Sequence, residues 1–401
     1  PAPFLMPRPF ARSPGSCWAP GWTATSMLTD ISLLRHERRG AAAALSALSL
    51  LLATGCVLLL LCRPPPSVHN RATNGRAAAK KDSPLLFFAM GDWGGGSRFM
   101  PTTRSQLANG DGMATVASWM GVTPAFVMAV GDNFYECGVT DVESRRFAST
   151  FEAAFNQPAL QVPWYAIAGN HDHCGNVSAQ LAYAAQRRGT ARWRYPHLWY
   201  TFTERAPSGA TVQIIYIDTV VLAGMPQEEG EPGVVAEQYA PHPAQRLGPE
   251  QLAWLDATLA SSTADYLWVS GHYPVFSPCQ HGPTPALLRD VLPLLRRHGA
   301  AGFIAGHDHC SAHYEQHGMA FVLSGAGREC CYHPRHLASP LNPGPPHFRM
   351  DRERHYGAIG GFASFSVGAG ATTLRYHSDN GTVLYTAEPI LPRRPEAGTE
   401  R

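Results

Sequence analysis

Apolar residues occur along this chain in short runs, and five of these runs end at a polar turn that contains glycine. Short apolar runs bounded by turn residues are typical of buried β-strands. The sequence therefore predicts five buried strands, each followed by a loop that carries aspartate, asparagine or histidine. The runs and their turns are 85–90 with GDWGGG, 125–130 with GDNFY, 164–168 with GNHDH, 266–269 with SGHYP and 302–305 with GHDH.

Helical spacing of apolar residues lies between several of these strands, at 112–120, 142–155, 249–259 and 284–298. Strands that alternate with helices indicate an α/β fold with much parallel pairing. In such sheets the loops at the carboxyl ends of the strands converge on a crevice, where ligands bind. All five polar turns fall at that end of a strand, so we expect them to meet at one site.

The remaining apolar runs predict further strands, which suit a second sheet packed on the first within a single domain. Two long stretches, 225–247 and 334–356, lack periodicity and are expected to be loops. The further strands are expected at 212–217, 320–324, 361–367, 372–377 and 383–386.

An uninterrupted apolar segment at 41–62 contains no charged residue. About 20 apolar residues are needed for a helix to span a bilayer, and this run is long enough. Arg35, Arg38 and Arg39 precede it and only Arg63 follows directly, which by the positive-inside rule places the N-terminus in the cytosol. A cleaved signal peptide is the alternative, but its apolar region is usually only about 7–15 residues long.

We therefore expect a single-pass type II membrane protein whose catalytic domain is lumenal or extracellular, with release by cleavage left open. Two sequons for N-glycosylation, at Asn176 and Asn380, fit that orientation. The expected organisation is a cytosolic segment 1–40, a transmembrane signal anchor 41–62, a linker 63–83, a catalytic domain 84–390 and a tail 391–401.

The net charge and the cysteines limit which binding partners and which cellular compartment are expected. The net charge is +2 with no long basic tract, so nucleic acid is not an expected partner. An even number of cysteines beyond the anchor permits disulfides in an oxidising compartment, while buried free thiols are the alternative. These cysteines are Cys137, Cys174, Cys279, Cys310, Cys330 and Cys331.

The polar turns supply a set of hard oxygen donors and imidazoles that suits iron, zinc or manganese. A single Asp after Gly is most often a helix cap or a turn residue. An ordered series at five successive strand ends instead favours a site for two adjacent metals with one shared carboxylate. The candidate ligands are Asp92, Asp132, Tyr135, Asn170, His272, His307 and His309.

These turns, with Tyr135 in its place, resemble those of the purple acid phosphatases within the metallophosphoesterase superfamily. The segments GNVSAQ at 175–180, HGPT at 281–284 and VLSGAG at 322–327 are similar to the mammalian-type tartrate-resistant branch. The resemblance covers 84–389 and implies a four-layer α/β/β/α sandwich of two mixed sheets with a dinuclear site at its edge.

The resemblance also implies how the ligands are divided. Asp92, Tyr135 and His309 would hold ferric iron, because anionic oxygens stabilise the more highly charged ion. Asn170, His272 and His307 would hold ferrous iron, zinc or manganese, and Asp132 would bridge the two ions. A metal-bound hydroxide would then attack phosphorus in line.

Two histidines match the residues of that family that bind substrate and protonate the leaving group. They are His171, which follows the ligand Asn170, and His281 of HGPT. Asp172 and His173 are expected to orient His171 or a ligand.

The chain departs from the tartrate-resistant branch in its cysteines. Ala223 and Ala286 stand where that branch has a disulfide, so both partners are missing together. Other cysteines instead follow the ligand motifs closely and either staple the active-site loops or pack there; metal ligation is a third alternative, which the complete set of oxygen and imidazole donors disfavours. They are Cys137, Cys174, Cys279 and Cys310.

The expected function is that of an acid phosphatase (EC 3.1.3.2 type) acting on phosphate monoesters, either small molecules or phosphoproteins, with a monomeric catalytic domain. The alternative is a phosphodiesterase or nucleotide pyrophosphatase on the same fold, and Tyr135 favours the first because it is the mark of purple-type chemistry. A non-catalytic binding protein with a vestigial site is a third interpretation. The set of candidate ligands is complete, so the sequence does not support it.

Overall fold

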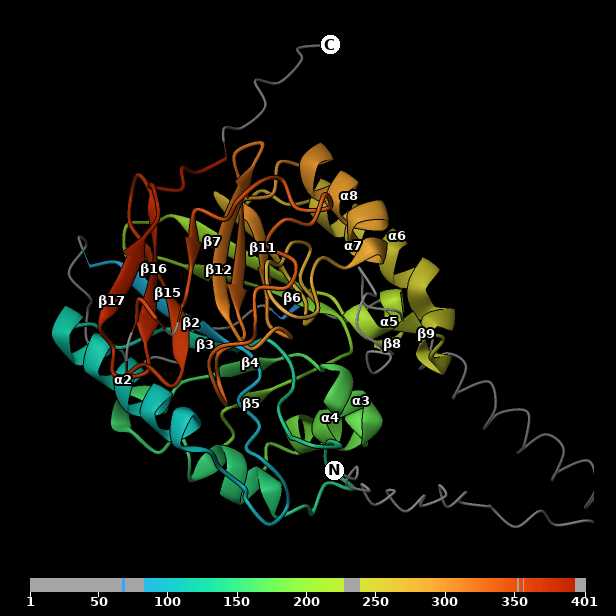
Figure 1. The fold of residues 1–401 in the computed structure, drawn as a ribbon, viewed down its shortest axis with the longest axis vertical. Helices are drawn as coiled ribbons and strands as arrows, with labels where there is room; N and C mark the ends of the chain where they lie inside the picture. Colours follow the sequence, from blue (N-terminus) through green and yellow to red (C-terminus); the bar gives the residue numbers. More distant parts are fainter. Residues whose placement is uncertain (1–66, 69–82, 227–238, 352, 356, 394–401) are drawn as a thin grey trace, which may run out of the picture. The chain divides into compact units, whose positions relative to one another are not determined.

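The computed structural model describes residues 67–68, 83–226, 239–351, 353–355 and 357–393 (Figure 1). The expected cytosolic segment 1–40 and anchor 41–62 lie outside the described residues, as do most of the linker and most of the tail. Within the described ranges no helix has both the length and the apolar character needed to cross a membrane. The chain divides into two compact units, and the described residues belong to the second, Pro64–Arg401.

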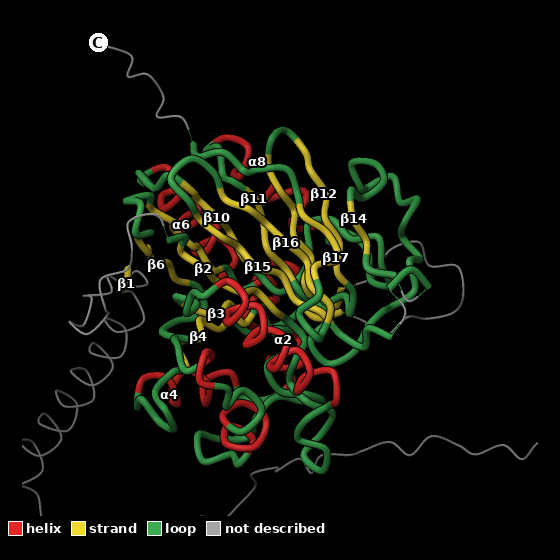
Figure 2. The backbone as a smooth tube through the Cα atoms, turned by 90° about the vertical axis from the view of Figure 1, so that its left-hand side faces the viewer, coloured by secondary structure: helices red, strands yellow, loops and turns green. Residues whose placement is uncertain are grey.

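The second unit is built on two mixed sheets, which we call sheet I and sheet II (Figures 1 and 2). Sheet I has the strand order β17-β16-β15-β2-β3-β4-β5, with parallel pairing from β2 to β5 and antiparallel pairing elsewhere. Its strands are β2 (Leu85–Met90), β3 (Phe126–Ala129), β4 (Trp164–Ala166), β5 (Trp193–Arg194), β15 (Gly361–Val367), β16 (Thr372–Ser378) and β17 (Val383–Thr386).

Sheet II has the order β1-β6-β7-β10-β11-β13-β12-β14 and a parallel centre from β7 to β13. A separate two-stranded ribbon joins β8 (Met225–Pro226) to β9 (Tyr239–Ala240). The strands of sheet II are β1 (Ser67–Val68), β6 (Tyr200–Arg205), β7 (Thr211–Tyr216), β10 (Tyr266–Ser270), β11 (Gly302–Ala305), β12 (Ser311–Gln316), β13 (Met319–Ser324) and β14 (Phe348–Arg349).

The two faces of sheet II belong to different parts of the core, because successive side chains of a strand point to opposite faces. Ile214 and Trp268 belong to the cluster shared with sheet I, and the ring of Trp268 lies 5.2 Å from that of Phe365 in sheet I. Their neighbours Ile215 and Val269 belong to a second cluster formed with helices. The sheets therefore pack face to face over aromatic and aliphatic side chains.

Helices cover the outer sides of the pair of sheets (Figure 1). On one side α2 (Arg104–Met120) contacts β15 and β16, and on the other α6 (Gly248–Ala260) contributes to the second cluster with α7 and α8. The other helices and helical turns are α3 (Asn170–Cys174), α4 (Val177–Ala185), α5 (Thr219–Ala223), α7 (Pro285–Asp290), α8 (Leu292–Arg297), a π-helical turn Phe147–Glu152 and 3₁₀ turns Pro158–Leu160 and Pro243–Leu247.

The five strands predicted before polar turns are confirmed as β2, β3, β4, β10 and β11. The prediction that they share one sheet was wrong, because β10 and β11 lie in sheet II while β15, β16 and β17 extend sheet I. Apolar patterning reports that a strand is buried but does not identify its hydrogen-bonding partner. The helix expected at 284–298 is two helices, since Pro293 at the start of α8 has no N–H to continue the α7 ladder.

Candidate metal centre

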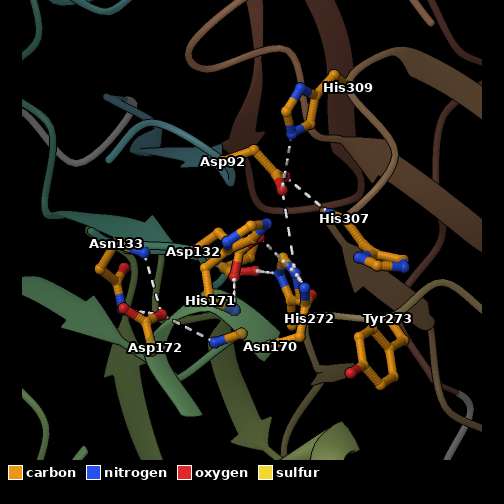
Figure 3. A network of polar contacts seen from close by, with 12 residues as sticks. Asp92, Asp132, Asn133, Asn170, His171, Asp172, His272, Tyr273, His307 and His309 are labelled. Atoms are coloured by element: carbon orange, nitrogen blue, oxygen red, sulfur yellow. Dashed lines mark hydrogen bonds and ion pairs between the residues drawn. The ribbon is translucent and has the colours of Figure 1, made fainter. Parts of the chain in front are cut away.

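The loops after β2, β3, β4, β10 and β11 bring a compact group of side chains together (Figure 3). Asp92, Asp132 and His272 are at most 1 % exposed, and each offers a ligand atom within 4.8 Å of those of the other two. Two buried carboxylates and an imidazole converging at this distance form a donor set that fits a metal ion. Asp92 and Asp132 come from sheet I loops and His272 from a sheet II loop, so the group lies between the sheets.

The loop backbone is shaped to aim these side chains inward. Asp92, Asp132 and His307 have φ values of 60°, 51° and 76°, in the left-handed region that side-chain-bearing residues rarely adopt. Such residues cost about 1–3 kcal/mol each and gather at functional sites. A Cβ on Gly169 would lie 2.1 Å from Asp132 Oδ1, and one on Gly306 would lie 2.5 Å from Asp92 Oδ2. Glycine is therefore required where these two loops pass the carboxylates.

Tyr135 places its phenol between the two carboxylates. Its hydroxyl lies 3.1 Å from Asp92 Oδ1, 3.0 Å from Asp132 Oδ2 and 2.9 Å from His309 Nε2. Burial and the two nearby carboxylates raise the pKa of this phenol well above its ordinary value. A cation at the site would be needed to ionise it.

Hydrogen bonds fix the two histidines that point their Nε2 atoms at the group. His272 Nδ1 donates to the Val130 carbonyl oxygen at 3.0 Å, and its Nε2 lies 3.1 Å from Asn170 Oδ1. His309 Nδ1 likewise has an oxygen acceptor as its partner, Glu329 Oε1 at 3.0 Å. A partner on the far nitrogen is the usual arrangement for histidines that bind a metal through the other nitrogen.

The charges at the site are those of a centre that attracts cations. Burial raises the pKa of Asp92 well above its ordinary value. Burial also opposes ionisation of Asp132, but the neighbouring His272 and His171 outweigh it and lower the pKa of that carboxyl. For His272, burial is in turn outweighed by the two carboxylates, which raise its pKa to about 10. The structure thus strongly favours positive charge between Asp92 and Asp132.

His307 differs from the other predicted ligands in its placement. Its backbone N–H donates to Asp92 Oδ2 at 2.7 Å, while its ring stacks on His281 with centroids 4.4 Å apart. The ring centroid is also 5.1 Å from that of His272, so the imidazole borders the group without belonging to the compact set of three (Figure 3).

The two histidines predicted to act on substrate lie at the rim of the group. The His171 backbone N–H donates to Asp132 Oδ1 at 3.0 Å, and its side chain is 36 % exposed. The ring of His171 lies 4.4 Å from that of Tyr135. His281 stacks on His307 and also lies 5.6 Å from the ring of Tyr332. Both rings therefore lie beside residues of the candidate metal centre.

Asp172 was expected to orient His171 or a ligand, and in the structure it holds the backbone of two loops that carry candidate ligands. Its carboxylate accepts hydrogen bonds from the backbone N–H groups of Asn133 at 3.0 Å and Gly169 at 2.9 Å, and from Gln180 Nε2 at 2.8 Å. These bonds join the loop that carries Asp132 to the loop that carries Asn170. His173 lies 2.7 Å from Asp218 and away from this junction.

Sequence reasoning did not assign the residues that hold the second half of the site. Asp308, inside GHDH, accepts the backbone N–H of His281 at 2.9 Å and so fixes the HGPT loop. Glu329 contacts His309, and the ring of Tyr332 stacks on His309 with centroids 4.2 Å apart. The position of Asp308 between two histidines was a signal that could have been used, whereas nothing in the pattern marked Glu329 or Tyr332.

Disulfides staple the loops that carry the ligands. Cys137–Cys174 joins the loop after Tyr135 to the end of α3, and Cys279–Cys310 joins the loop after His272 to the loop after His309. Cys330 and Cys331, adjacent in sequence, form the third pair. Of the two alternatives left open by the sequence, the structure shows stapling.

Comparison with known proteins places these observations in a family. The calcineurin-like phosphoesterase family model matches residues 85–311. The chain is 38 % identical over 326 residues to tartrate-resistant acid phosphatase type 5 of Sus scrofa, covering 80 % of this chain and 90 % of that protein. The chain belongs to the purple acid phosphatase family. By class it is a phosphoric monoester hydrolase of the acid phosphatase type.

A plant purple acid phosphatase is also similar to this chain. Purple acid phosphatase 7 of Arabidopsis thaliana is 29 % identical over 312 residues, covering 76 % of this chain and 86 % of that protein. Among solved structures, GAP50, described as the anchor in the inner membrane complex of Plasmodium, superposes with a TM-score of 0.61 at 21 % identity. That superposition covers 78 % of this chain and 90 % of GAP50, and it supports the shared fold alone.

The Cys137–Cys174 bridge is expected to contribute measurably to the stability of this purple acid phosphatase. The two cysteines are 37 residues apart, and closing a loop of that length contributes about 4 kcal/mol in the chain-entropy description. We expect the double variant Cys137→Ala/Cys174→Ala to lose about 2–4 kcal/mol of unfolding free energy, measured by urea denaturation of the metal-free protein. The difference should shrink when both proteins are reduced; equal stability of the oxidised proteins would contradict the bridge.

Proposed function

We propose that this chain hydrolyses phosphate monoesters at a dinuclear metal centre formed by the loops of both sheets. The observation that carries the proposal is the convergence of Asp92, Asp132 and His272 within 4.8 Å, with the Tyr135 phenol between the carboxylates. When bound, a metal pair polarises the phosphoryl oxygens and supplies a nucleophile from water for in-line displacement.

The proposed division of ligands follows the chemistry of the side chains. Asp92, Tyr135 and His309 offer a carboxylate, a phenol and an imidazole on one side of Asp132, a set that favours ferric iron. Asn170 and His272 offer an amide oxygen and an imidazole on the other side, 3.1 Å apart, and suit ferrous iron, zinc or manganese. His307 completes this second set in the proposal if its ring turns from His281 toward the site.

His171 and His281 are proposed to bind phosphate oxygens and to give a proton to the leaving group. Both rings lie beside proposed ligands, His171 at 4.4 Å from Tyr135 and His281 at 4.4 Å from His307. Imidazolium can donate both a hydrogen bond and a proton at acidic pH, where its charged form dominates. Asp308 supports this role for His281 by holding the backbone of its loop.

The test compares the hydrolysis of 4-nitrophenyl phosphate and bis(4-nitrophenyl) phosphate by the full-length chain at about pH 5. We expect the monoester to be hydrolysed at least about 100-fold faster, as kcat/KM, and chelation of metal to abolish turnover. A preference for the diester would replace this proposal with the phosphodiesterase alternative.

The membrane anchor at 41–62 and a lumenal or extracellular catalytic domain are also proposed. Support comes from the charge-free apolar run and from disulfides in the ligand loops, which persist in oxidising compartments. Asn176 and Asn380, the two sequon asparagines, are both exposed, as glycosylation requires. Protease protection of sealed microsomes carrying the chain would test the orientation: a catalytic domain digested from the cytosolic side would overturn it.

A further inference from the structure

A cavity lies beside the candidate metal centre, and the proposal above assigns it no role. Its volume is about 880 Å³, and three segments form it: 100–105 at the start of α2, 328–330 after β13 and 357–359 before β15. Pockets that hold small organic ligands commonly have volumes of about 300–1,000 Å³. The cavity is therefore large enough for the organic part of a substrate.

The cavity and the metal centre share a wall. The guanidinium carbon of Arg328 lies 4.2 Å from the ring centre of Tyr135, and Glu329 Oε1 lies 3.0 Å from His309 Nδ1. Both Arg328 and Glu329 also line the cavity. A phosphate ester with its phosphate at the metal centre can therefore place its leaving group against the same two residues.

Hydrogen bonds from α2 hold this wall in place. Thr103 Oγ1 donates to the Arg328 carbonyl oxygen at 2.9 Å, and Ser105 Oγ donates to that of Gly327 at 3.2 Å. Asn109 Nδ2 adds a bond to the same Gly327 oxygen at 2.9 Å. The helix itself begins at Thr103 with reciprocal capping by Gln106. The wall is thus attached to a regular element, so the cavity is formed before a ligand binds.

The lining combines apolar side chains with positive charge. Met100 is 65 % exposed and Ile359 is 38 % exposed, so both offer apolar surface to a ligand. Arg328 is 3.8 Å from Glu329, whereas Arg104 forms no ion pair with any residue that the structure describes. The cavity therefore offers apolar contacts and the charge of one guanidinium that no described carboxylate neutralises.

We propose that this cavity is a leaving-group subsite that selects phosphate monoesters whose organic part is apolar and carries a second anionic group. Arg104 binds the second anion, and Met100 and Ile359 contact the apolar part. The proposal rests on the proposed phosphatase function, and the second anion can be a carboxylate or another phosphate. Arginine suits either, since its planar guanidinium binds both groups through paired hydrogen bonds.

The test measures selectivity in the full-length chain. Hexane-1,6-diyl bisphosphate and hexyl phosphate have the same apolar chain and differ only in the second anion. We expect the ratio of their kcat/KM values to fall about fivefold to tenfold in Arg104→Glu, because an exposed ion pair is lost and a repulsion replaces it. The effect should weaken as salt increases.

Arg289→Glu is the matched control, because it makes the same charge change on α7 at a side chain that is 69 % exposed and outside the cavity.

A second substrate pair identifies the source of the anion: the capped peptides phosphotyrosine–leucine–glutamate and phosphotyrosine–leucine–lysine. A glutamate preference that Arg104→Glu removes indicates a carboxylate, and a fall in the bisphosphate ratio alone indicates a phosphate. Unchanged ratios in both pairs, or an equal fall in Arg289→Glu, would overturn the subsite.

Calorimetric binding of hexane-1,6-diyl bisphosphonate and hexylphosphonate separates this proposal from the function it rests on. These compounds are not hydrolysed, so their affinity ratio reports the cavity without turnover. An affinity ratio that falls in Arg104→Glu supports the subsite even if 4-nitrophenyl phosphate is not hydrolysed, and a ratio that stays constant refutes it even if hydrolysis is rapid.

Discussion

Replacing Asp132 with Asn should lower kcat/KM for 4-nitrophenyl phosphate by at least about a thousandfold, equivalent to about 4 kcal/mol of transition-state stabilisation. Asp132 contacts residues that the proposal assigns to both metal ions and to phosphate binding. Its Oδ2 lies 3.0 Å from the Tyr135 hydroxyl and 3.3 Å from His272 Nε2, and its Oδ1 accepts the His171 N–H. Asparagine has the same shape but removes the negative charge that two cations would share.

Metal content and activity should fall together in this variant. The protein should remain folded, because the amide oxygen can still accept the His171 N–H, and circular dichroism would check this. Asp111→Asn is the control: Asp111 is exposed and accepts one hydrogen bond from Gln157 at 2.8 Å, so activity should not change. A metal-depleted Asp132→Asn protein with full activity would contradict the dinuclear proposal.

Replacing Tyr135 with Phe should abolish the visible absorption of the iron-loaded protein. A phenolate bound to ferric iron gives a charge-transfer band in the visible region, and the Tyr135 hydroxyl is the only tyrosine hydroxyl among the described residues in contact with Asp92 and Asp132. The phenyl ring of the variant keeps the packing against His171, so the loss of the band reports the hydroxyl and not the fold.

Tyr183→Phe is the matched control for this measurement. Tyr183 is also buried, and its hydroxyl lies 3.5 Å from Glu152, which is not one of the proposed ligands. Its removal should leave the band unchanged. A wild-type protein that is metal-loaded, folded and colourless would instead remove the ferric assignment and favour a zinc or manganese centre on the same ligands.

The strands and the polar turns that follow them could be located from the sequence because their signal is local. Each loop follows a short buried run, and a strand such as β2 at Leu85–Met90 can be read from its composition and its turn alone. The rule that parallel strands present their carboxyl ends at a common edge places Asp92 and Asp132 together on sheet I. It does not account for His272, because β10 lies in sheet II and this side chain joins the group through the packing of the two sheets.

What the sequence did not predict depends on contacts between distant segments. Whether β10 pairs with β7 or with a sheet I strand is decided by how whole faces pack, and apolar patterning is the same in either case. Glu329 lies 3.0 Å from His309. The backbone just before Glu329 is held by Thr103, which lies more than 200 residues earlier in the chain and donates to the Arg328 carbonyl oxygen. Such partners have no fixed spacing from the motif they support, so a motif search cannot find them.

The distribution of ligands over two sheets has a consequence for how the protein comes apart. Asp92, Asp132 and Asn170 follow strands of sheet I, and His272 and His309 follow strands of sheet II, so bound ions would tie the sheets as cross-links. Ligands that bind only the native state stabilise it by mass action. Removal of metal should therefore accelerate amide hydrogen exchange in β2 and β10 together, and the metal-depleted protein should become more accessible to proteases across both sheets at once.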